Sequence, residues 1–230
     1  MNARRGGIPR GALVVSCQAR EDNPLHGPAF MAAMAQAAAQ GGAGAIRANG
    51  PRDIAAIRAV VDLPVIGILK RFTEGVPVYI TPSFDDAKVV AEAGADIVAV
   101  DATARDRGGE TLAGLIDAIR GRLGLPVFAD VSTLDEGLAA EAAGAAYVAT
   151  TLAGYTGPAA VARGSGPDLD LLTALLAACR VPVVAEGRYD SPDLAARALA
   201  LGAHAVVVGT MITNPREISR RFAAALAGRC

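Results

Sequence analysis

Short apolar runs alternate with alanine-rich segments along most of the chain. One kind of run opens with Pro-Val, and its three members start at Pro64, Pro126 and Pro182. The other kind opens with Gly-Ala, and its members start at Gly44, Gly94, Gly144 and Gly202. Such short runs are typical of parallel strands buried on both faces, and a glycine in front of a strand ends the preceding helix. Together with a first run over residues 13–18, the pattern predicts eight strands.

The segments between the runs have the length and the start signals of helices. Three of them begin behind a residue that commonly caps a helix N-terminus, namely Ser83, Ser191 or Asn214, and in two cases a proline follows the cap. Helices are therefore predicted over residues 30–40, 85–93, 111–120, 134–143, 169–179, 193–200 and 216–227.

Eight alternating strand and helix units in 230 residues predict a (β/α)₈ barrel. A doubly wound open sheet is the alternative, and the absence of a G-x-G-x-x-G sequence after any strand argues against it. We expect a single domain over residues 1–230, with residues 1–10 as a flexible N-terminal segment. The one longer loop, over residues 156–167, is rich in glycine and follows the sixth strand.

Composition and charge narrow the function classes. The chain is 52% hydrophobic but only 4% aromatic, so its core must be built from Ala, Val, Leu and Ile. A formal net charge of -1 gives no sign of a nucleic-acid or membrane-surface partner. Three cysteines without C-x-x-C spacing fit a reducing cytoplasm better than a disulfide framework. The basic N-terminus is not followed by an apolar stretch, so no signal peptide is predicted and the expected location is the cytoplasm.

Polar residues close nearly every apolar run: Gln18, Arg47, Lys70, Asp101, Asp130, Thr150, Thr151, Glu186 and Thr210. In a barrel of this kind the active site lies at the C-terminal ends of the strands. Asp130 and Glu186 stand four residues after the proline of their runs, and Lys70 stands six after, so all three share one parity. We therefore expect them to face the barrel mouth. A structural ion-pair network is the alternative, but charges of both signs converging at this end favour function.

Lys70 is the strongest candidate for chemistry. Only two of the 22 basic residues are lysines, Lys70 and Lys88. An arginine stays protonated, whereas a desolvated lysine can lose its proton and act as a base or an amine nucleophile. Lys70 ends an apolar run, which suits that role, whereas Lys88 stands among acidic residues in a helical pattern and is interpreted as a surface residue.

The ends of the last two predicted strands form a candidate phosphate site. Gly187 and Arg188 follow strand seven, and Gly209 and Thr210 follow strand eight. Glycines at these turns let backbone N–H groups approach a ligand, and the loops after strands seven and eight are the usual phosphate cradle of such barrels. Arg188 can add a bidentate contact. A barrel of the phosphate-binding type is therefore predicted.

Other reactive side chains carry less information. His26 lies in the loop after the first strand and could line the site, whereas His204 lies before the last strand, at the bottom of the barrel. Cys17 has the opposite parity to Gln18, so we interpret it as a small buried residue under the helices. No cluster with metal-ligand spacing and no Ser/His/Asp elbow is present, so no metal is predicted.

Taken in order, the strand ends resemble the N-acylglucosamine-6-phosphate 2-epimerases, also called N-acetylmannosamine-6-phosphate 2-epimerases. The resemblance spans about residues 11 to 222 and is specific because many short motifs occur together. The matching segments are Val15–Ala19, Asn23–His26, Ala45–Ala48, Leu63–Arg71, Tyr79–Pro82, Val100–Thr103, Ala129–Thr133, Thr150–Thr156, Ala185–Arg188 and Val208–Thr210.

This resemblance implies a (β/α)₈ barrel that interconverts N-acetylmannosamine 6-phosphate and N-acetylglucosamine 6-phosphate, a step in bacterial sialic-acid catabolism. It implies a catalytic lysine at Lys70 and a catalytic glutamate at Glu186. The implied substrate contacts are Gln18, Arg47, Asp130 and Arg188. No cofactor is expected, the partner is a phosphosugar, and the oligomeric state stays open, with a homodimer as one option.

One departure from the family pattern concerns the phosphate. Family members often carry Thr-Arg-Pro shortly after strand eight, and that arginine helps to hold the phosphate. Here Asn214 stands in its place, and Arg216 is two residues further on, out of register for the same reach. Phosphate binding would then rest on Arg188, backbone amides and a helix N-terminus.

Inversion at carbon 2 requires a base that is neutral at working pH, whereas a free lysine has a pKa near 10.4. Desolvation and the neighbouring Arg47 would lower the pKa of Lys70. Glu186 would shuttle or orient a proton or assist ring opening, and Arg47 and Gln18 would stabilise enolate and acetamido oxygens. Two alternatives remain: a Schiff-base lyase, which borohydride would trap, and a non-catalytic phosphosugar-binding barrel. The latter would need neither Lys70 nor Glu186.

Overall fold

The computed structural model describes residues 6–156 and 166–228, and the statements below concern those residues. Eight parallel strands pair in sequence order, and β8 pairs with β1 to close the barrel. The strands are β1 Ala12–Cys17, β2 Ala45–Asn49, β3 Val65–Ile68, β4 Ile97–Asp101, β5 Val127–Asp130, β6 Tyr147–Ala149, β7 Val183–Glu186 and β8 Ala205–Val208. The predicted (β/α)₈ barrel is confirmed, and the open-sheet alternative is wrong.

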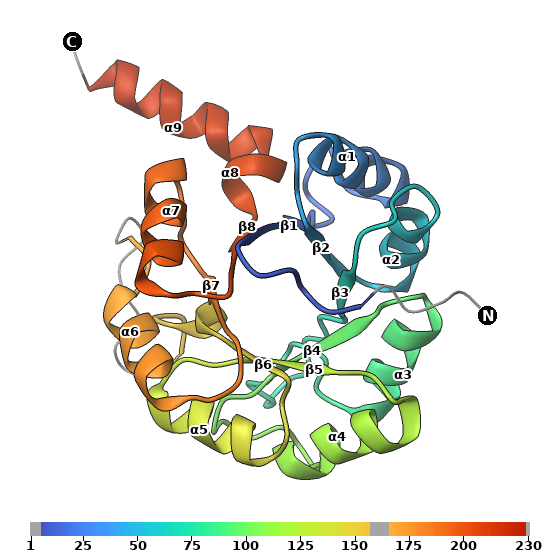
Figure 1. The fold of residues 1–230 in the computed structure, drawn as a ribbon. Coiled ribbons are helices and arrows are strands. Elements are labelled where there is room, and N and C mark those ends of the chain that lie inside the picture. The colour runs from blue at the N-terminus through green and yellow to red at the C-terminus, as the bar shows by residue number, and fades with distance from the viewer. Residues whose placement is uncertain (1–5, 157–165, 229–230) are drawn as a thin grey trace.

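Helices surround the strands (Figure 1). They are α1 Pro28–Gln40, α2 Pro51–Arg58, α3 Phe84–Glu92, α4 Leu112–Ala118, α5 Leu134–Ala142, α6 Leu169–Ala178, α7 Pro192–Leu201, α8 Thr210–Thr213 and α9 Pro215–Ala227, with a π-helical turn at Ile119–Leu123 and a 3₁₀ turn at Thr150–Leu152. The predicted caps are present, because the side chains of Ser83, Ser191 and Asn214 each accept a backbone N–H of the following helix. Helix α2 supplies the helix that the alternating units require after β2.

Two apolar layers hold the barrel together. Inside it, Ile66, Ile97 and Phe128 pack with other inward-facing residues, and a second layer lies between the strands and the helices. Cys17 belongs to the outer layer and is fully buried, as predicted, and burial raises the pKa of its thiol to about 12. Gly67 lets α3 approach the sheet, because a Cβ at this position would overlap Val90.

Hydrogen bonds to the backbone of Ile8 close the bottom of the barrel. The backbone N–H of Ile8 donates to the hydroxyl of Tyr147 at 3.1 Å, and the carbonyl of Ile8 lies 2.8 Å from Nε2 of His204. Ile8 is buried against these residues. Ile8 thus lies against the barrel, the flexibility predicted for residues 1–10 stays a prediction, and residues 1–5 lie outside the described residues. Most of the predicted long loop, residues 157–165, lies outside them too.

The last helix differs from the others. Helices α1 to α7 lie against the barrel, whereas α9 extends outward past α7 (Figure 1). None of its residues is buried, and Phe222 and Leu226 are each 68% exposed. Within the described ranges, no helix combines the length and the apolar character that crossing a membrane requires.

Candidate active site

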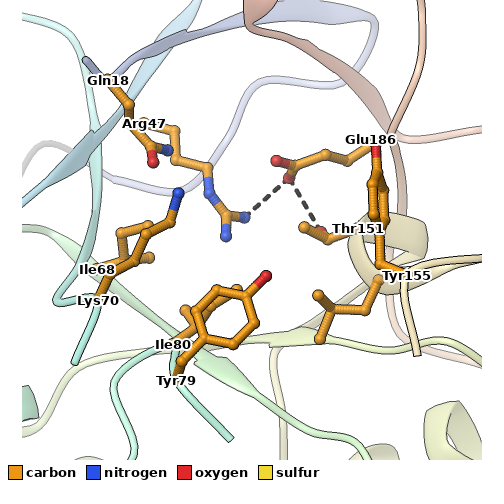
Figure 2. A pocket seen from close by; sticks show the side chains of 10 residues that line it. Gln18, Arg47, Ile68, Lys70, Tyr79, Ile80, Thr151, Tyr155 and Glu186 are labelled. Atoms are coloured by element: carbon orange, nitrogen blue, oxygen red, sulfur yellow. Dashed lines mark hydrogen bonds and ion pairs between the residues drawn. The ribbon is translucent and has the colours of Figure 1, made fainter. Parts of the chain in front are cut away.

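One pocket opens at the C-terminal ends of the strands, and charged side chains from β2, β3 and β7 meet in it (Figure 2). Its volume is about 380 Å³, counting space that is open to solvent. It is lined by Gln18, Arg47, Ile68, Lys70, Tyr79, Ile80, Thr151, Leu152, Tyr155 and Glu186. The structure thus brings Gln18, Arg47, Lys70 and Glu186 together. The shared parity predicted this for Lys70 and Glu186, and also for Asp130, which does not line the pocket.

Arg47 is the central charge of the site. It is 1% exposed, and its Nη2 donates to Oδ2 of Asp130 at 2.6 Å while Nη1 reaches Oδ1 at 3.0 Å. Nη1 also donates to Oε2 of Glu186 at 2.8 Å. Burial alone would lower the pKa of Arg47, but Asp130 and Glu186 outweigh it and raise the pKa, so the guanidinium stays charged. Its orientation is fixed by carboxylates on two other strands.

Asp130, at the end of β5, lies behind Arg47 rather than on the pocket surface. Its side chain is fully buried, and it is absent from the residues that line the pocket. Besides the bidentate pair with Arg47, it accepts a hydrogen bond from Thr151 Oγ1 at 2.5 Å. The resemblance implies a substrate contact for Asp130, whereas the geometry supports a role in holding Arg47 and Thr151.

Glu186, the last residue of β7, faces the pocket. Its Oε2 accepts hydrogen bonds from Arg47 and, at 3.1 Å, from Thr151 Oγ1 (Figure 2). Burial raises the pKa of Glu186 to about 7, although Arg47 opposes the shift, and the charge of Asp130 adds to it. Near neutral pH this carboxyl group can therefore both hold and release a proton.

Lys70 lies two residues beyond β3, with its ammonium group directed into the pocket (Figure 2). Its backbone N–H donates to Asn49 Oδ1 at 2.9 Å, and it forms an antiparallel bridge with Ile80. The residue is accessible from the pocket, but lost hydration on the protein side lowers its pKa to about 8, with Arg47 acting in the same direction and Glu186 in the opposite. A substantial neutral fraction is therefore available close to neutral pH.

A small hairpin over residues 70–80 carries a pocket residue that the strand ends do not reveal. Tyr79 lines the pocket and stacks on Phe72, with ring centroids 5.2 Å apart. Thr81 follows, with a left-handed φ of 45°, and exchanges hydrogen bonds with the backbone of Leu69 on the other arm. Tyr79 occurs in one motif of the resemblance but ends no apolar run, so the sequence pattern gave it no role.

The predicted phosphate residues lie at the ends of β7 and β8. Gly187 has a φ of 108°, and Arg188 has a φ of 60°, which an arginine rarely adopts. The Arg188 guanidinium donates to the carbonyls of Ala153 at 2.7 Å and Gly166 at 2.8 Å and lies over the ring of Tyr155. It therefore stands at the rim, and Arg188 is not among the residues that line the pocket.

Gly209 and Thr210 mark the junction of β8 with the short helix α8. Gly209 packs tightly against β1, because a Cβ there would lie 3.3 Å from the Cβ of Ser16. Thr210 is the first residue of α8. Phosphate-binding barrels commonly place a short extra helix at this point, with its N-terminus toward the ligand.

Asn214 and Arg216 have structural partners. The Oδ1 atom of Asn214 caps α9 through the N–H of Glu217 and also accepts from Asn23 Nδ2, each at 3.3 Å. Arg216 donates to the carbonyl of Asp22 at 2.9 Å and pairs with its carboxylate at 3.2 Å. Both side chains therefore tie α9 to the loop after β1.

The described residues contain no group of three or more His, Cys, Asp or Glu side chains placed to hold a metal ion. His26, one candidate for lining the site, is exposed and is absent from the residues that line the pocket.

Two comparisons with solved structures bear on this fold. The chain superposes on the N-acetylmannosamine-6-phosphate 2-epimerase from Clostridium perfringens with a TM-score of 0.90 and 42% identity. The match covers 95% of this chain and 94% of that one. Thiamine phosphate pyrophosphorylase from Pyrococcus furiosus shares the fold alone, with a TM-score of 0.60 and 19% identity over 91% of this chain and 90% of that one.

Sequence comparisons agree with the superposition. Two relatives are each named "Putative N-acetylmannosamine-6-phosphate 2-epimerase" and are each 50% identical to this chain. The one from Caldanaerobacter subterraneus matches 91% of this chain and 89% of its own length, and the one from Thermosynechococcus vestitus matches 94% of both. A family profile described as "Putative N-acetylmannosamine-6-phosphate epimerase" matches residues 31–228. The chain belongs to the N-acetylmannosamine-6-phosphate 2-epimerase family.

Proposed function

We propose that this chain interconverts N-acetylmannosamine 6-phosphate and N-acetylglucosamine 6-phosphate by removing and returning the proton on carbon 2. The observation that carries the proposal is one pocket holding a lysine of lowered pKa, a buried arginine and a glutamate of raised pKa. Family membership supplies the substrate class. The expected reaction runs through the open-chain aldehyde and an enolate.

Lys70 is the proposed base. With a pKa of about 8, about a tenth of the side chain is neutral at pH 7, far more than for a free lysine. The fixed charge of Arg47 disfavours a second positive charge nearby and can stabilise the enolate oxygen as it forms. Gln18, on the same wall of the pocket, is the proposed partner of the acetamido group.

Glu186 is the proposed second proton carrier. A carboxyl group with a pKa of about 7 is protonated in about half of the molecules near neutral pH, so it can give a proton to the sugar or take one during ring opening. Lys70 alone, or Lys70 and Glu186 together, can serve the two faces of carbon 2. Both routes use the same pocket.

The phosphate is proposed to bind between the ends of β7 and β8. Gly187 has a left-handed φ there, Gly209 precedes Thr210 at the start of α8, and Arg188 adds positive charge at the rim. The capping role of Asn214 supports giving it no more than a minor part in phosphate binding.

Proton NMR in deuterated water tests this function. Each of the two phosphosugars, incubated with the protein, should yield the other and gain deuterium at carbon 2, whereas unphosphorylated N-acetylmannosamine should react far more slowly. No interconversion would overturn the proposal.

Borohydride added during turnover should leave the protein mass unchanged, because an enolate is not trapped. A covalent sugar adduct on Lys70 would instead favour the Schiff-base lyase.

We further propose that the chain forms a homodimer through α9. Phe222 and Leu226 are exposed on this helix, and Phe30 on α1, Leu201 on α7 and Ile212 on α8 are exposed elsewhere on the same chain. Two copies related by a two-fold axis can bury such apolar side chains reciprocally.

Light scattering after size exclusion tests the dimer. The wild-type protein should have twice the 23.2 kDa mass of one chain, and the double change Phe222→Glu with Leu226→Glu should give a monomer. Lys88→Ala, on the exposed face of α3, is the matched surface control. A monomeric wild type, or a double variant that stays dimeric, would contradict the role of α9.

A cytoplasmic location is proposed as well, supported by the free thiols of Cys17 and Cys179.

A further inference from the structure

One hydroxyl group lies between the two buried carboxylates of the site. Thr151 Oγ1 is 2.5 Å from Asp130 Oδ1 and 3.1 Å from Glu186 Oε2. Arg47 Nη1 reaches the same two oxygen atoms, at 3.0 and 2.8 Å. The two carboxylates are therefore bridged twice, once by a charged donor and once by a neutral group that can both donate and accept.

The number of protons restricts what Thr151 can do. Its hydroxyl carries one proton, so it can donate to only one of two ionised carboxylates at a time. When Glu186 is protonated, its own O–H can donate to Thr151 Oγ1, and the threonine proton is then free for Asp130. When Glu186 is ionised, the same hydroxyl can turn and donate to Glu186. The hydrogen bond can thus reverse its direction with the protonation of Glu186.

Thr150 shows that this arrangement is specific to residue 151. Its hydroxyl donates to the carbonyl of Glu186 at 2.8 Å and accepts the Glu186 N–H at 3.0 Å. Thr150 therefore holds the backbone of Glu186, whereas the Thr151 hydroxyl contacts the carboxyl group of Glu186 and not its backbone. Two adjacent threonines of the same turn divide backbone and side-chain support between them.

We propose that Thr151 is a positioning residue for Glu186, donating to its ionised carboxylate and accepting from its protonated carboxyl group, so that Glu186 can release and regain a proton without leaving a buried oxygen unpartnered. This role rests on the proposed function, in which Glu186 carries a proton during the reaction. The net proton count is unchanged by Thr151, which only changes the direction of its one hydrogen bond.

The charges around Glu186 stay the same when the Thr151 hydroxyl is removed. Arg47 on β2 and Lys70 beyond β3 favour its ionised form, whereas Asp130 on β5 favours the protonated form. Beside it in the sheet, β8 contributes the apolar Val207. Without the Thr151 hydroxyl, the ionised pair loses one hydrogen bond and the protonated pair loses two, so the pair should bind a proton less tightly.

Carbon NMR of protein labelled at the glutamate carboxyl carbons tests this without any need for turnover. The Glu186 signal is identified by its loss in Glu186→Gln, and its titration is followed in the wild type and in Thr151→Val. We expect the midpoint to move down by about one pH unit in Thr151→Val, the size expected for the one additional hydrogen bond of the protonated form. Thr151→Ser keeps the hydroxyl and should restore the wild-type midpoint.

Thr150→Val is the matched control, since it loses backbone support and stability but should not move the midpoint. Thr151→Ala serves in place of Thr151→Val if the latter does not fold. An unchanged midpoint in both hydroxyl-free variants, or an equal shift in Thr150→Val, would overturn the proposal. In activity, Thr151→Val should lower kcat about tenfold and move the limb of the pH profile that reports Glu186 to lower pH. If the wild type fails to epimerise, the NMR titration still decides the role of Thr151.

Discussion

The two ends of the barrel are closed by different chemistry. At the bottom, Ile8, Tyr147 and His204 meet through hydrogen bonds to the backbone of Ile8. At the mouth, Arg47 is buried between two carboxylates. Phe128 lies between the two ends, with the Arg47 guanidinium 5.2 Å above its ring and the Tyr147 ring 6.1 Å away.

This difference separates structural from functional charge. Inside the barrel, Ile8, Tyr147 and His204 close the bottom without an ion pair, and the ion pair of Arg58 and Asp96 lies at the edge where β3 and β4 begin. Buried ions are costly to desolvate and give little net stability even when they are well paired. The charged cluster at the mouth is therefore better explained by proton chemistry than by closure of the barrel. Substitutions at the two ends should accordingly differ in what they change.

The largest effect is expected for Lys70→Arg. It keeps the positive charge and most of the side-chain length, but an arginine does not give up its proton. A loss of about 10²–10⁴-fold in kcat is expected while phosphosugar binding survives, with Lys70→Ala equally inactive. Steady-state rates and deuterium uptake at carbon 2 measure this. An active Lys70→Arg protein would move the base to Glu186.

Arg47→Met should give the largest loss of stability. It leaves two buried carboxylates facing each other without their cation, which costs about 3–5 kcal/mol of unfolding free energy. Urea denaturation measures the loss, and adding Asp130→Asn should recover part of it. If Arg47→Met leaves the free energy of unfolding unchanged, the two carboxylates do not need Arg47 to offset their charges.

Arg188→Ala should affect binding more than chemistry. Losing a charged hydrogen bond worth about 1.5–3 kcal/mol should raise KM by roughly one to two orders of magnitude while kcat stays near wild type. Inhibition by inorganic phosphate should weaken in parallel. A variant with unchanged KM would remove Arg188 from the phosphate site.

The pH dependence of stability should reflect the raised pKa of Glu186. Its pKa rises from an ordinary 4.5 to about 7 on folding, so between these values the folded chain holds a proton that the unfolded chain has lost. The stability of the wild type relative to Glu186→Gln should therefore fall as pH rises from about 5 to 7. Thermal melts of both proteins across this range measure it, and parallel curves would contradict the raised pKa.

The smallest effect belongs to the bottom of the barrel. Tyr147→Phe removes the oxygen that accepts the Ile8 N–H and should cost about 1 kcal/mol of unfolding free energy with kcat unchanged. A marked loss of activity would show that the two ends are coupled through Phe128.

The sequence predicted the barrel because short apolar runs alternate with helix-like segments, and the polar residues that close most runs predicted that Gln18, Arg47, Lys70 and Glu186 meet at one mouth. Parity gives the face of a strand but not the depth of a side chain, so it could not show that Asp130 lies behind Arg47. Tyr79 comes from a hairpin outside the barrel strands, where no run marks it.

Two further features depend on tertiary context. The amphipathic pattern of α9 is the same whether the helix packs on its own barrel or on another copy, so its outward direction could not be predicted. The Arg188 side chain is held by carbonyls of Ala153 and Gly166, which are remote in sequence. Because every residue has a backbone carbonyl, the pattern of residue types cannot show which carbonyls bind Arg188.

The left-handed backbone at Thr81 and Arg188 implies a conflict between thermal stability and activity. Such a conformation costs a non-glycine residue roughly 1–3 kcal/mol, and both residues lie beside the pocket, one in the hairpin that carries Lys70 and one after Glu186. Glycine at either position would relieve the strain, but it would remove the hydroxyl that holds Leu69 or the guanidinium at the rim. Selection for heat resistance alone would therefore favour replacements that the reaction does not tolerate.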